Sequence, residues 1–414
     1  MTAAETMLRA LRDRREGYAL TQPFYTSADF HRVELDHLFH QEWMFAGHDC
    51  EVANPGDYFT LVVGDYPLIV TRDKAGQLHA HPNSCRHRGS QLCDAPRGSV
   101  KRFVCPYHQW SYDPDGSLVR AKAMNLQPFD PKEFSLRPAH IESVGGYIFV
   151  SVAADPPDFA PFRDMVESYF TPFDLANAKV AFEDRIEENG NWKLVLENNR
   201  ECYHCAGSHP ELCRTFPEAP SFMRTTNNQG EGVIEQFWKA VEAEGLPSRF
   251  RIAESGQYRV SRIPLMNHAR SYTMSGEPAV ARRMGRVPDR ELGSLMFFHF
   301  PTTWNHFLGD MVISFRVLPL GPHKTELVTK WLVNRDAVEG VDYDLKTMTE
   351  VWVATNAEDA ELVARNQRGI NSPAYEPGPY SLDYEDGVIQ FIDWYARLME
   401  ARIGGGTGRL KSVA

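Results

Sequence analysis

The pattern of hydrophobic and polar residues divides the chain into three segments. Residues 2–17 are polar and arginine-rich, and residues 29–43 carry apolar side chains at helical spacing, so both are predicted to be helical. Residues 44–155 hold short strand-like runs separated by turn signals such as those at 54–57 and 113–116, and they are predicted to form a small all-β domain. The strand-like runs lie at 58–63, 67–71, 78–81, 102–106, 109–112 and 147–152.

Helices and strands are mixed after the proline pair at 156–157. Strands are predicted at 180–188 and, as three consecutive antiparallel strands, at 295–300, 310–318 and 325–333. Helices are predicted at 192–205, 232–243, 345–366 and 387–402. The expected protein is α+β, with a helical arm at 1–43, a β domain at 44–155 and a larger domain at 156–414, to which the arm belongs.

Composition and charge argue against several classes of protein. The 414 residues carry a formal net charge of −11, whereas a nucleic-acid-binding surface needs an excess of basic side chains. No run of 18 apolar residues is present, so no membrane span is predicted. Seven cysteines are an odd number in a chain without an export signal, so no disulfide framework is expected. The expected location is the cytoplasm, where reduced cysteines are free to bind metal.

Two loops of the predicted β domain each contain one cysteine and one histidine. Cys85 and His87 form a Cys-x-His motif, and Cys105 and His108 form a Cys-x-x-His motif after 17 intervening residues. Two thiolates and two imidazoles can hold a structural zinc ion or a [2Fe–2S] cluster. Zinc modules usually begin with paired cysteines, whereas one Cys and one His on each loop match a Rieske cluster, with two thiolates on one iron and two imidazoles on the other. The spacing therefore favours a Rieske cluster over zinc.

A second group of candidate ligands follows in the larger domain. His204 and His209 are five residues apart, which on a helix places them near one face, helped by a small irregularity. Neutral imidazoles bind iron, copper or zinc, and a carboxylate from elsewhere in the chain would complete a triad that leaves open positions on Fe(II). Taken alone, two histidines at this spacing are more often surface or core residues.

The two loops and the motif Glu201-x-x-His204-x4-His209, preceded by Asn-Trp-Lys at 191–193, resemble the catalytic large subunit of Rieske non-haem iron oxygenases over nearly the whole chain. This resemblance implies an all-β Rieske domain joined to a catalytic domain whose antiparallel sheet is flanked by helices. It also implies a head-to-tail homotrimer. Five segments are similar to the betaine N-demethylase branch, namely 197–205, 303–306, 329–333, 338–344 and 377–381.

The resemblance also assigns roles to individual residues. It implies that the [2Fe–2S] cluster is held by Cys85, His87, Cys105 and His108, and the mononuclear Fe(II) by His204, His209 and Asp359. It places Asn198 and Glu201 in the catalytic machinery. Many family members have Asp at the position of Glu201, where the carboxylate bridges an iron-ligand histidine and a cluster histidine of the neighbouring subunit. Glutamate is one methylene longer and can still accept both hydrogen bonds.

Two adjacent acids compete for the role of third iron ligand. On the helix predicted at 345–366, Asp359 lies one or two turns from the apolar residues Trp352 and Leu362, and Glu358 is rotated from it by about 100°. Periodicity leaves both acids open, and it also allows that they form a solvated acidic face. The family pattern of Asp, two residues and then Leu-Val selects Asp359.

The aromatic-rich stretch at 295–307 is the expected substrate pocket, because a quaternary ammonium ion cannot donate a hydrogen bond and is held against aromatic faces instead. The candidate cage residues are Trp304, Phe298, Phe300 and Tyr203, with Tyr258 as a further possibility. Candidate donors to a substrate carboxylate are His306, Asn305 and Arg262. The alternative is that most of these rings fill the core.

The resemblance implies a monooxygenase that acts on glycine betaine or proline betaine. Electrons from NAD(P)H would pass through a ferredoxin- or flavin-type reductase to the Rieske cluster and then to the mononuclear iron, where O2 is used to hydroxylate an N-methyl group. Formaldehyde would then be released. Between residues 85 and 122, seven basic against three acidic side chains predict a docking surface for an acidic reductase. The alternatives are an aromatic substrate for the same fold, and a non-catalytic iron–sulfur electron-transfer or zinc-stabilised binding protein.

Overall fold

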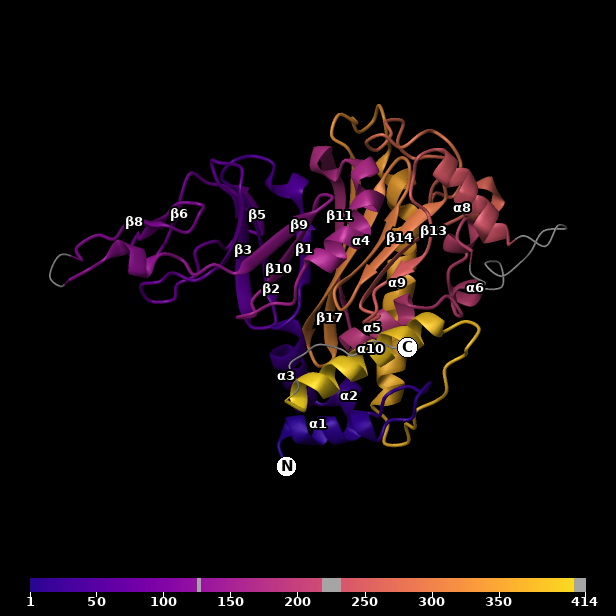
Figure 1. The fold of residues 1–414 in the computed structure, drawn as a ribbon, viewed down its shortest axis with the longest axis horizontal. Helices are drawn as coiled ribbons and strands as arrows, with labels where there is room; N and C mark the ends of the chain where they lie inside the picture. Colours follow the sequence, from indigo (N-terminus) through magenta and orange to yellow (C-terminus); the bar gives the residue numbers. More distant parts are fainter. Residues whose placement is uncertain (125–127, 218–231, 406–414) are drawn as a thin grey trace. The chain divides into compact units, whose positions relative to one another are not determined.

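The computed structural model describes residues 1–124, 128–217 and 232–405, and the chain divides into two compact units (Figure 1). The β unit comprises Phe39–Phe159, and the larger unit comprises Met1–Leu38 together with Ala160–Ala414. The N-terminal helices therefore belong to the same unit as the C-terminal two thirds of the chain. No helix in the described ranges combines the length and apolar character needed to cross a bilayer.

The β unit contains three small antiparallel sheets. Their strand orders are β4-β3-β2-β5, β1-β10-β9 and β6-β7-β8. The strands are β1 Met44–His48, β2 Asp57–Val63, β3 Tyr66–Arg72, β4 Leu78–Pro82, β5 Arg97–Ser99, β6 Phe103–Val104, β7 Ser111–Tyr112, β8 Leu118–Arg120, β9 His140–Val144 and β10 Tyr147–Ser151. The pattern missed β1, β5, β8 and β9, because β5 is exposed throughout, β8 and β9 are largely unburied, and β1 is buried on both faces; none of them alternates.

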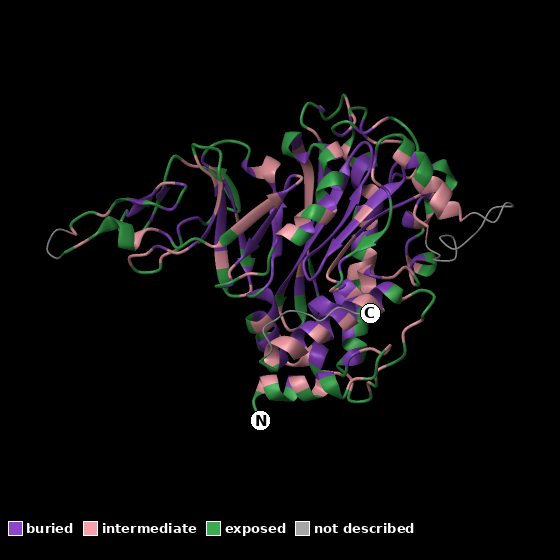
Figure 2. Ribbon diagram, in the orientation of Figure 1, coloured by how far each residue is buried: buried purple, intermediate pink, exposed green. Residues whose placement is uncertain are grey.

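In the described part of the larger unit, one antiparallel sheet of seven strands forms the centre (Figure 1). Its order is β11-β17-β16-β15-β14-β13-β12. The strands are β11 Ala178–Glu188, β12 Arg251–Ile252, β13 Tyr258–Ile263, β14 Ser294–His299, β15 Thr303–Phe307, β16 Val312–Gly321 and β17 Lys324–Asn334. β16 and β17 are buried along almost their whole length (Figure 2), which explains why they appear in the sequence as apolar runs.

Helices surround this sheet, and α9 packs against β11 and α5. The helices are α1 Ala3–Arg12, α2 Pro23–Thr26, α3 Ala28–Glu34, α4 Ala160–Phe170, α5 Trp192–Asn199, α6 Cys205–Ser208, α8 Val233–Ala243, α9 Leu345–Ile370 and α10 Asp386–Ile403. The helix predicted at 29–43 is instead α3 followed by a π-helical turn, Leu35–Phe39. Part of the irregular stretch expected between 216 and 251 lies outside the described residues.

Two differences from the predicted elements concern the candidate chemistry. The pattern predicted three strands between 295 and 333, but the structure has four, because β15 contains the buried polar residues Asn305 and His306 and does not have an apolar pattern. The helix predicted at 192–205 ends at Asn199, and a turn precedes the four-residue α6. This turn carries Glu201 and His204.

A buried ion pair fixes α5, the helix that leads into this turn. Lys193 Nζ lies 2.6 Å from Glu34 Oε1 on α3, and both side chains are fully buried. Glu34 also accepts hydrogen bonds from Trp192 Nε1 at 2.9 Å and from the Tyr395 hydroxyl at 2.6 Å. Removing one partner of a buried pair leaves an uncompensated charge, which typically destabilises a protein by about 3–5 kcal/mol. The pair therefore ties the N-terminal helices to the segment that carries the histidines.

Candidate metal centres

Two tight loops of the β unit hold its cysteine–histidine motifs. In the first loop, Cys85 N donates to Ser90 O at 2.8 Å, and Gly89, which has a positive φ of 77°, donates from its N to Cys85 O at 2.9 Å. In the second loop, Cys105 N donates to Trp110 O at 2.8 Å. Backbone hydrogen bonds thus fix each cysteine at the start of its loop.

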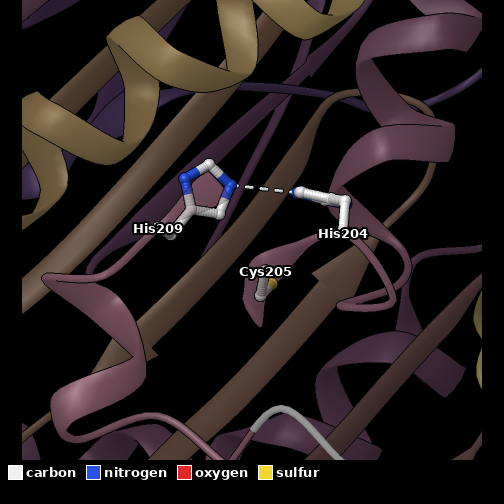
Figure 3. Close-up of side chains that lie close together, drawn as sticks. All are labelled: His204, Cys205 and His209. Carbon is white, nitrogen blue, oxygen red and sulfur yellow. Dashed lines mark hydrogen bonds between the residues drawn. The ribbon is translucent and has the colours of Figure 1, made fainter. Parts of the chain in front are cut away.

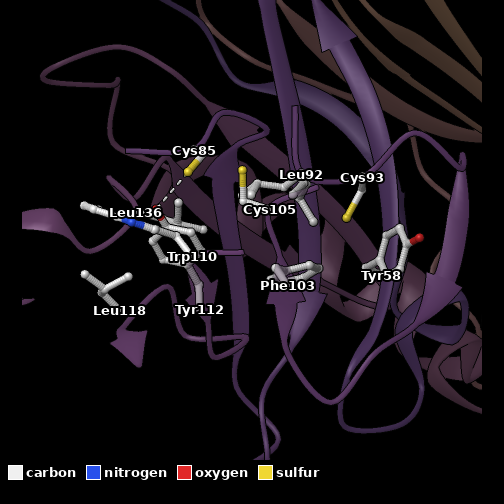
Figure 4. Packing of buried hydrophobic residues seen from close by; sticks show 11 residues of the cluster. Tyr58, Cys85, Leu92, Cys93, Phe103, Cys105, Trp110, Tyr112, Leu118 and Leu136 are labelled. Atoms are coloured by element: carbon white, nitrogen blue, oxygen red, sulfur yellow. Dashed lines mark hydrogen bonds between the residues drawn. The ribbon is translucent and has the colours of Figure 1, made fainter. Parts of the chain in front are cut away.

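The four side chains on these loops suit a [2Fe–2S] cluster. Both thiols are buried and free of disulfides, and they lie in one hydrophobic core (Figure 4). The imidazole centroids of His87 and His108 lie 4.7 Å apart, and the Nδ1 atom of each is buried without a hydrogen-bond partner among the described residues. Buried ring nitrogens normally have a partner, so two such atoms beside two thiols match a cluster held by two thiolates and two imidazoles.

Surrounding groups orient these ligands, and at Cys105 they favour the thiolate form. Tyr112 lies with its hydroxyl 3.3 Å from Cys85 Sγ, and the ring of His87 stacks on Trp110 at 4.7 Å. Burial alone would raise the pKa of Cys105, but hydrogen bonds from the backbone of His108 and its neighbour outweigh burial and lower it. Hydrogen bonds of this kind to ligand sulfurs tune the potential of an iron–sulfur cluster.

In the larger unit, His204 and His209 face each other across α6 (Figure 3). His204 immediately precedes this four-residue helix, and His209 follows it with φ −126° and ψ 68°. The two histidines therefore flank a four-residue helix, where a helix with a small irregularity was expected. The break in the helix turns the two Nε2 atoms towards each other at 3.0 Å.

Asp359 on α9 completes this group. Its Oδ1 atom lies 3.2 Å from His204 Nε2 and 3.0 Å from His209 Nε2. Three donors on adjacent corners of an octahedron, with metal–ligand bonds of about 2.1 Å at right angles, are about 3.0 Å apart. The three atoms thus have the spacing of one face of an octahedral metal site, and a metal held there would keep open positions on its other side.

Two further carboxylates contact the Nδ1 atoms of the two histidines. Glu201 Oε1 lies 2.5 Å from His204 Nδ1, and Glu358 Oε2 lies 2.7 Å from His209 Nδ1. Carboxylates in this position keep Nδ1 protonated, so that Nε2 is free for the metal. Periodicity could not choose between these two adjacent acids as the third ligand. The structure distinguishes them, because Asp359 faces the Nε2 atoms and Glu358 faces Nδ1 of His209. Sequence reasoning missed this orienting position of Glu358.

The electrostatics of this group favour a cation. Burial would lower the pKa of His204, but hydrogen bonds to Asp359 and Glu201 outweigh burial and raise it to about 9. The pKa of His209 is raised in the same way by Asp359 and Glu358. The carboxylates that stabilise a proton on each ring would also stabilise a divalent cation between them.

A disulfide bond joins Cys202 and Cys205 on either side of His204, with Cα atoms 5.0 Å apart. The expectation of reduced cysteines is wrong for this pair, because the turn before α6 brings them within bridging distance. The Sγ atom of Cys205 lies within 4.8 Å of the imidazole nitrogens, but a disulfide sulfur is not a thiolate and is a poor metal ligand. Asp359 is therefore the better third donor.

A small cavity opens beside the three donors. Its aromatic and sulfur-containing wall is formed by Phe216, Met296, Phe298, His306 and Trp352. Met296 and His306 are cross-strand neighbours on β14 and β15, and Trp352 reaches the same place from α9. Phe216 and Trp352 were not among the candidate cage residues. In the sequence, the one indication for Trp352 was its place on the inward, partly apolar face of the predicted helix.

The structure places three of the expected cage residues outside this cavity. The ring of Trp304 stacks on Phe315 at 5.0 Å. Phe300 packs in the core against the ring of Trp394 at 5.2 Å. Tyr203 is 60% exposed. These assignments are corrected, because strand alternation shows which face a ring occupies but not how far along the strand the cavity extends.

Three other candidates for the pocket also lie outside the cavity. Tyr258 stacks on His299 at 5.7 Å, and Arg262 donates from Nη1 to Leu292 O at 3.2 Å. Asn305 donates from Nδ2 to Thr303 Oγ1 at 2.9 Å. None of the three lines the cavity. Of the residues expected to bind substrate, Phe298 and His306 remain at the cavity wall.

A second cavity of about 410 Å³ lies on the other side of Glu201 and His204, which border both cavities together with Asn198. Asn198 Nδ2 lies 3.5 Å from His204 Nε2, so this residue stands beside the candidate metal ligands. Glu197 also lines the larger cavity and accepts hydrogen bonds from the hydroxyls of Tyr25 at 2.8 Å and Tyr380 at 3.0 Å.

Comparison with known proteins agrees with both groups of side chains. Residues 42–130 match the Rieske [2Fe-2S] domain, and residues 175–401 match the ring hydroxylating alpha subunit (catalytic domain). The glycine betaine monooxygenase oxygenase subunit of Pseudomonas aeruginosa (strain UCBPP-PA14) is 45% identical over 406 residues, covering 98% of this chain and 94% of that protein. The chloroplastic choline monooxygenase of Spinacia oleracea is 26% identical over 389 residues, covering 91% and 77%.

Solved structures show the same fold. The quaternary ammonium Rieske monooxygenase CntA, in complex with an inhibitor, superposes with a TM-score of 0.72 at 20% identity, covering 94% of this chain and 97% of that chain. Naphthalene 1,2-dioxygenase from Rhodococcus sp. superposes with a TM-score of 0.70 at 20% identity, covering 96% and 98%. The chain therefore belongs to the Rieske non-haem iron ring-hydroxylating oxygenases, as a catalytic alpha subunit with a [2Fe–2S] cluster and a mononuclear iron.

Proposed function

We propose that this oxygenase removes an N-methyl group from a small quaternary ammonium compound, glycine betaine or proline betaine. The observation that carries the proposal is the 45% identity over almost the whole length to glycine betaine monooxygenase oxygenase subunits. The aromatic cavity beside the metal-ligand candidates supports it, because aromatic faces bind quaternary ammonium ions. Family membership also makes the non-catalytic electron-transfer alternative wrong.

The reaction balances with one molecule of O2. The N-methyl group, O2, two electrons and two protons give an N-hydroxymethyl group and water, and the hydroxymethyl product then loses formaldehyde and a proton to leave the tertiary amine. The mononuclear iron, held by His204, His209 and Asp359, would supply the O2 chemistry when bound. The protein positions the methyl group: Glu201 and Glu358 keep both imidazoles oriented, and the cavity wall excludes water.

The rings of Phe216 and Trp352 are the best placed to bind the ammonium group. Phe298 also lines the cavity, but the guanidinium of Arg200 already lies 3.9 Å from the centroid of its ring. A ring face occupied by a protein cation is not free for a substrate cation. This argument transfers the predicted cage from Trp304, Phe300 and Tyr203 to Phe216 and Trp352.

The electrons would come from NAD(P)H through a ferredoxin- or flavin-type reductase, in the cytoplasm. The loops of the β unit offer exposed basic residues, Arg88, Lys101 and Arg102, although Arg102 is paired with Asp113 at 2.8 Å. An acidic partner would be steered to such a surface, and salt screens the attraction as the Debye length falls from about 10 Å at 0.1 M to about 3 Å at 1 M. The rate of cluster reduction should therefore fall steeply with salt and lose part of this dependence in Lys101→Glu.

A homotrimer, with the cluster of one subunit serving the iron of the next, completes the proposal. The cavity beside His204 supports it, because Glu197, Glu201 and Glu385 line it and would attract the basic cluster loops of another copy. Glu201 would then bridge the two centres. Sedimentation at micromolar concentration should give the mass of a trimer, and a stable monomer that retains turnover would contradict this arrangement.

The test of the function is product release. The purified holoenzyme is supplied with a reductase, NADH and O2, and formaldehyde is measured with glycine betaine, proline betaine, choline and benzoate in parallel. We expect formaldehyde from at least one betaine, in a one-to-one ratio with O2 consumed. Hydroxylation of benzoate without formaldehyde from either betaine would support the aromatic alternative instead.

A further inference from the structure

Two nitrogen-bearing rings stand side by side in the wall of the cavity next to the metal-ligand candidates. His306 on β15 and Trp352 on α9 both line this cavity, and their ring centroids lie 4.7 Å apart. His306 is 2% exposed and Trp352 is 5% exposed. They come from elements about 40 residues apart in sequence, so the tertiary fold alone makes them neighbours.

Both rings carry a buried nitrogen without a partner. His306 Nδ1 and Trp352 Nε1 make no hydrogen bond to any described residue. Leaving a buried polar group unsatisfied destabilises the fold, so such atoms in a native protein need an explanation. Two other indole N–H groups are partnered, since Trp192 Nε1 donates to Glu34 at 2.9 Å and Trp238 Nε1 donates to Arg262 O at 2.7 Å. Those of Trp304, Trp331 and Trp394 are buried without a partner among the described residues, and Trp352 differs from these three because it lines the cavity.

The surroundings of His306 keep its imidazole neutral. The ring is enclosed by the aromatic rings of Phe216, Tyr272, Phe315 and Trp352. Burial lowers the pKa of His306 to about 3, so the neutral imidazole offers one N–H donor at physiological pH. Among the residues that the structure describes, no lysine or arginine lines the cavity. Among these described residues, an anionic group that enters the cavity would therefore be bound by neutral donors.

We propose that His306 and Trp352 bind the carboxylate of the betaine substrate, each donating a ring N–H to it. This inference rests on the proposed function and adds how the enzyme distinguishes a betaine from choline, which has the same trimethylammonium head but an alcohol in place of the carboxylate. Hydrogen bonds to a charged acceptor are about twice as strong as those to a neutral hydroxyl. The pair would thus select the anionic tail, while the neighbouring aromatic faces hold the cation.

The test compares two substitutions that remove a donor but keep a ring, Trp352→Phe and His306→Phe. The matched control is Trp304→Phe, because the Trp304 Nε1 atom is also buried and unpartnered but lies outside the cavity. Dissociation constants of glycine betaine and choline are measured by titration calorimetry on the anaerobic holoenzyme. Cluster absorbance and iron content confirm that each variant is folded and loaded.

Each cavity variant should weaken glycine betaine binding by about 10- to 100-fold and choline binding by less than about threefold. Trp304→Phe should change neither constant. An equal loss of affinity for both ligands would overturn the proposal, because the two N–H donors would then not distinguish a carboxylate from an alcohol. Unchanged glycine betaine affinity in both cavity variants would also overturn it. If the wild-type enzyme binds neither betaine, the proposed function itself fails, which is a different result from a loss of discrimination.

Discussion

The two metal centres differ in how their donors are brought together. The cluster donors lie on two short loops between residues 85 and 108, and the backbone hydrogen bonds of each loop fix its cysteine. The mononuclear donors come from residues 204, 209 and 359, and they meet only because a broken helix and α9 are packed against each other. A centre of the first kind is visible in the sequence spacing, whereas one of the second kind depends on the whole larger unit.

This difference predicts that the centres can be lost separately. Substitution Cys85→Ser should remove the cluster, since an alcohol does not replace a thiolate on iron, and turnover with reductase should fall below detection. Labile sulfide and the visible absorption should disappear, while about one iron per chain remains in the larger unit. Loss of both kinds of iron would show that the centres are structurally coupled.

The matched control for this substitution is Cys93→Ser. Cys93 is buried in the same hydrophobic core as Cys85, but burial raises the pKa of its thiol to about 11, so it stays protonated (Figure 4). The Cys93→Ser variant should keep its cluster and lose only some stability.

The reciprocal substitution is Asp359→Ala. Removing one of three donors should abolish retention of the mononuclear iron and lower turnover by more than about 1000-fold, while the cluster spectrum stays unchanged. Iron analysis and the visible spectrum check this. The control is Glu361→Ala on the same helix, where the exposed carboxylate pairs with Arg365 at 2.8 Å and should be dispensable. A normal iron content in Asp359→Ala would mean that another group is the ligand.

The orienting carboxylates should have smaller and unequal effects. Glu201→Gln and Glu358→Gln should each weaken iron retention by about 10- to 100-fold, because an amide holds an imidazole N–H less strongly than a carboxylate. Only Glu201→Gln should also slow electron transfer from cluster to iron, because only Glu201 is proposed to bridge the subunits. Chelator challenge measures the first effect and single-turnover oxidation of the reduced cluster measures the second. Equal electron-transfer rates in the two variants would remove the bridging role from Glu201.

The smallest expected effect concerns pH and Glu197. Burial raises the pKa of Glu197 to about 7, although the hydroxyls of Tyr25 and Tyr380 oppose this by donating to it. A carboxyl whose folded pKa lies above its unfolded value of about 4.5 contributes stability that is complete below pH 4.5 and is lost as pH rises through 7. The wild type should therefore lose about 2–3 kcal/mol more than Glu197→Gln between pH 4.5 and 8. Parallel thermal melts at pH 5 and pH 8 check this, and parallel curves for the two proteins would contradict it.

Some parts of the fold could be predicted because their signals are local. The motifs at Cys85 and Cys105 identify the cluster type, since ligand identity and spacing within a loop are sequence properties. The long helix that carries Asp359 has a clear helical period, and β16 and β17 are apolar runs. The strand β15 was missed for the opposite reason, because its buried polar residues interrupt the apolar pattern.

Sequence alone determined the chemical types of the donors: two cysteines and two histidines for the cluster, and two histidines with an acid for the mononuclear iron. Only the tertiary structure decided that Asp359 faces the Nε2 atoms and Glu358 the opposite nitrogen, because this depends on the rotation of α9 against the turn at His204. It also decided that Trp352, and not Trp304, lines the cavity. A residue type fixes which bonds a side chain can make, but the packing of distant elements fixes which partner it meets.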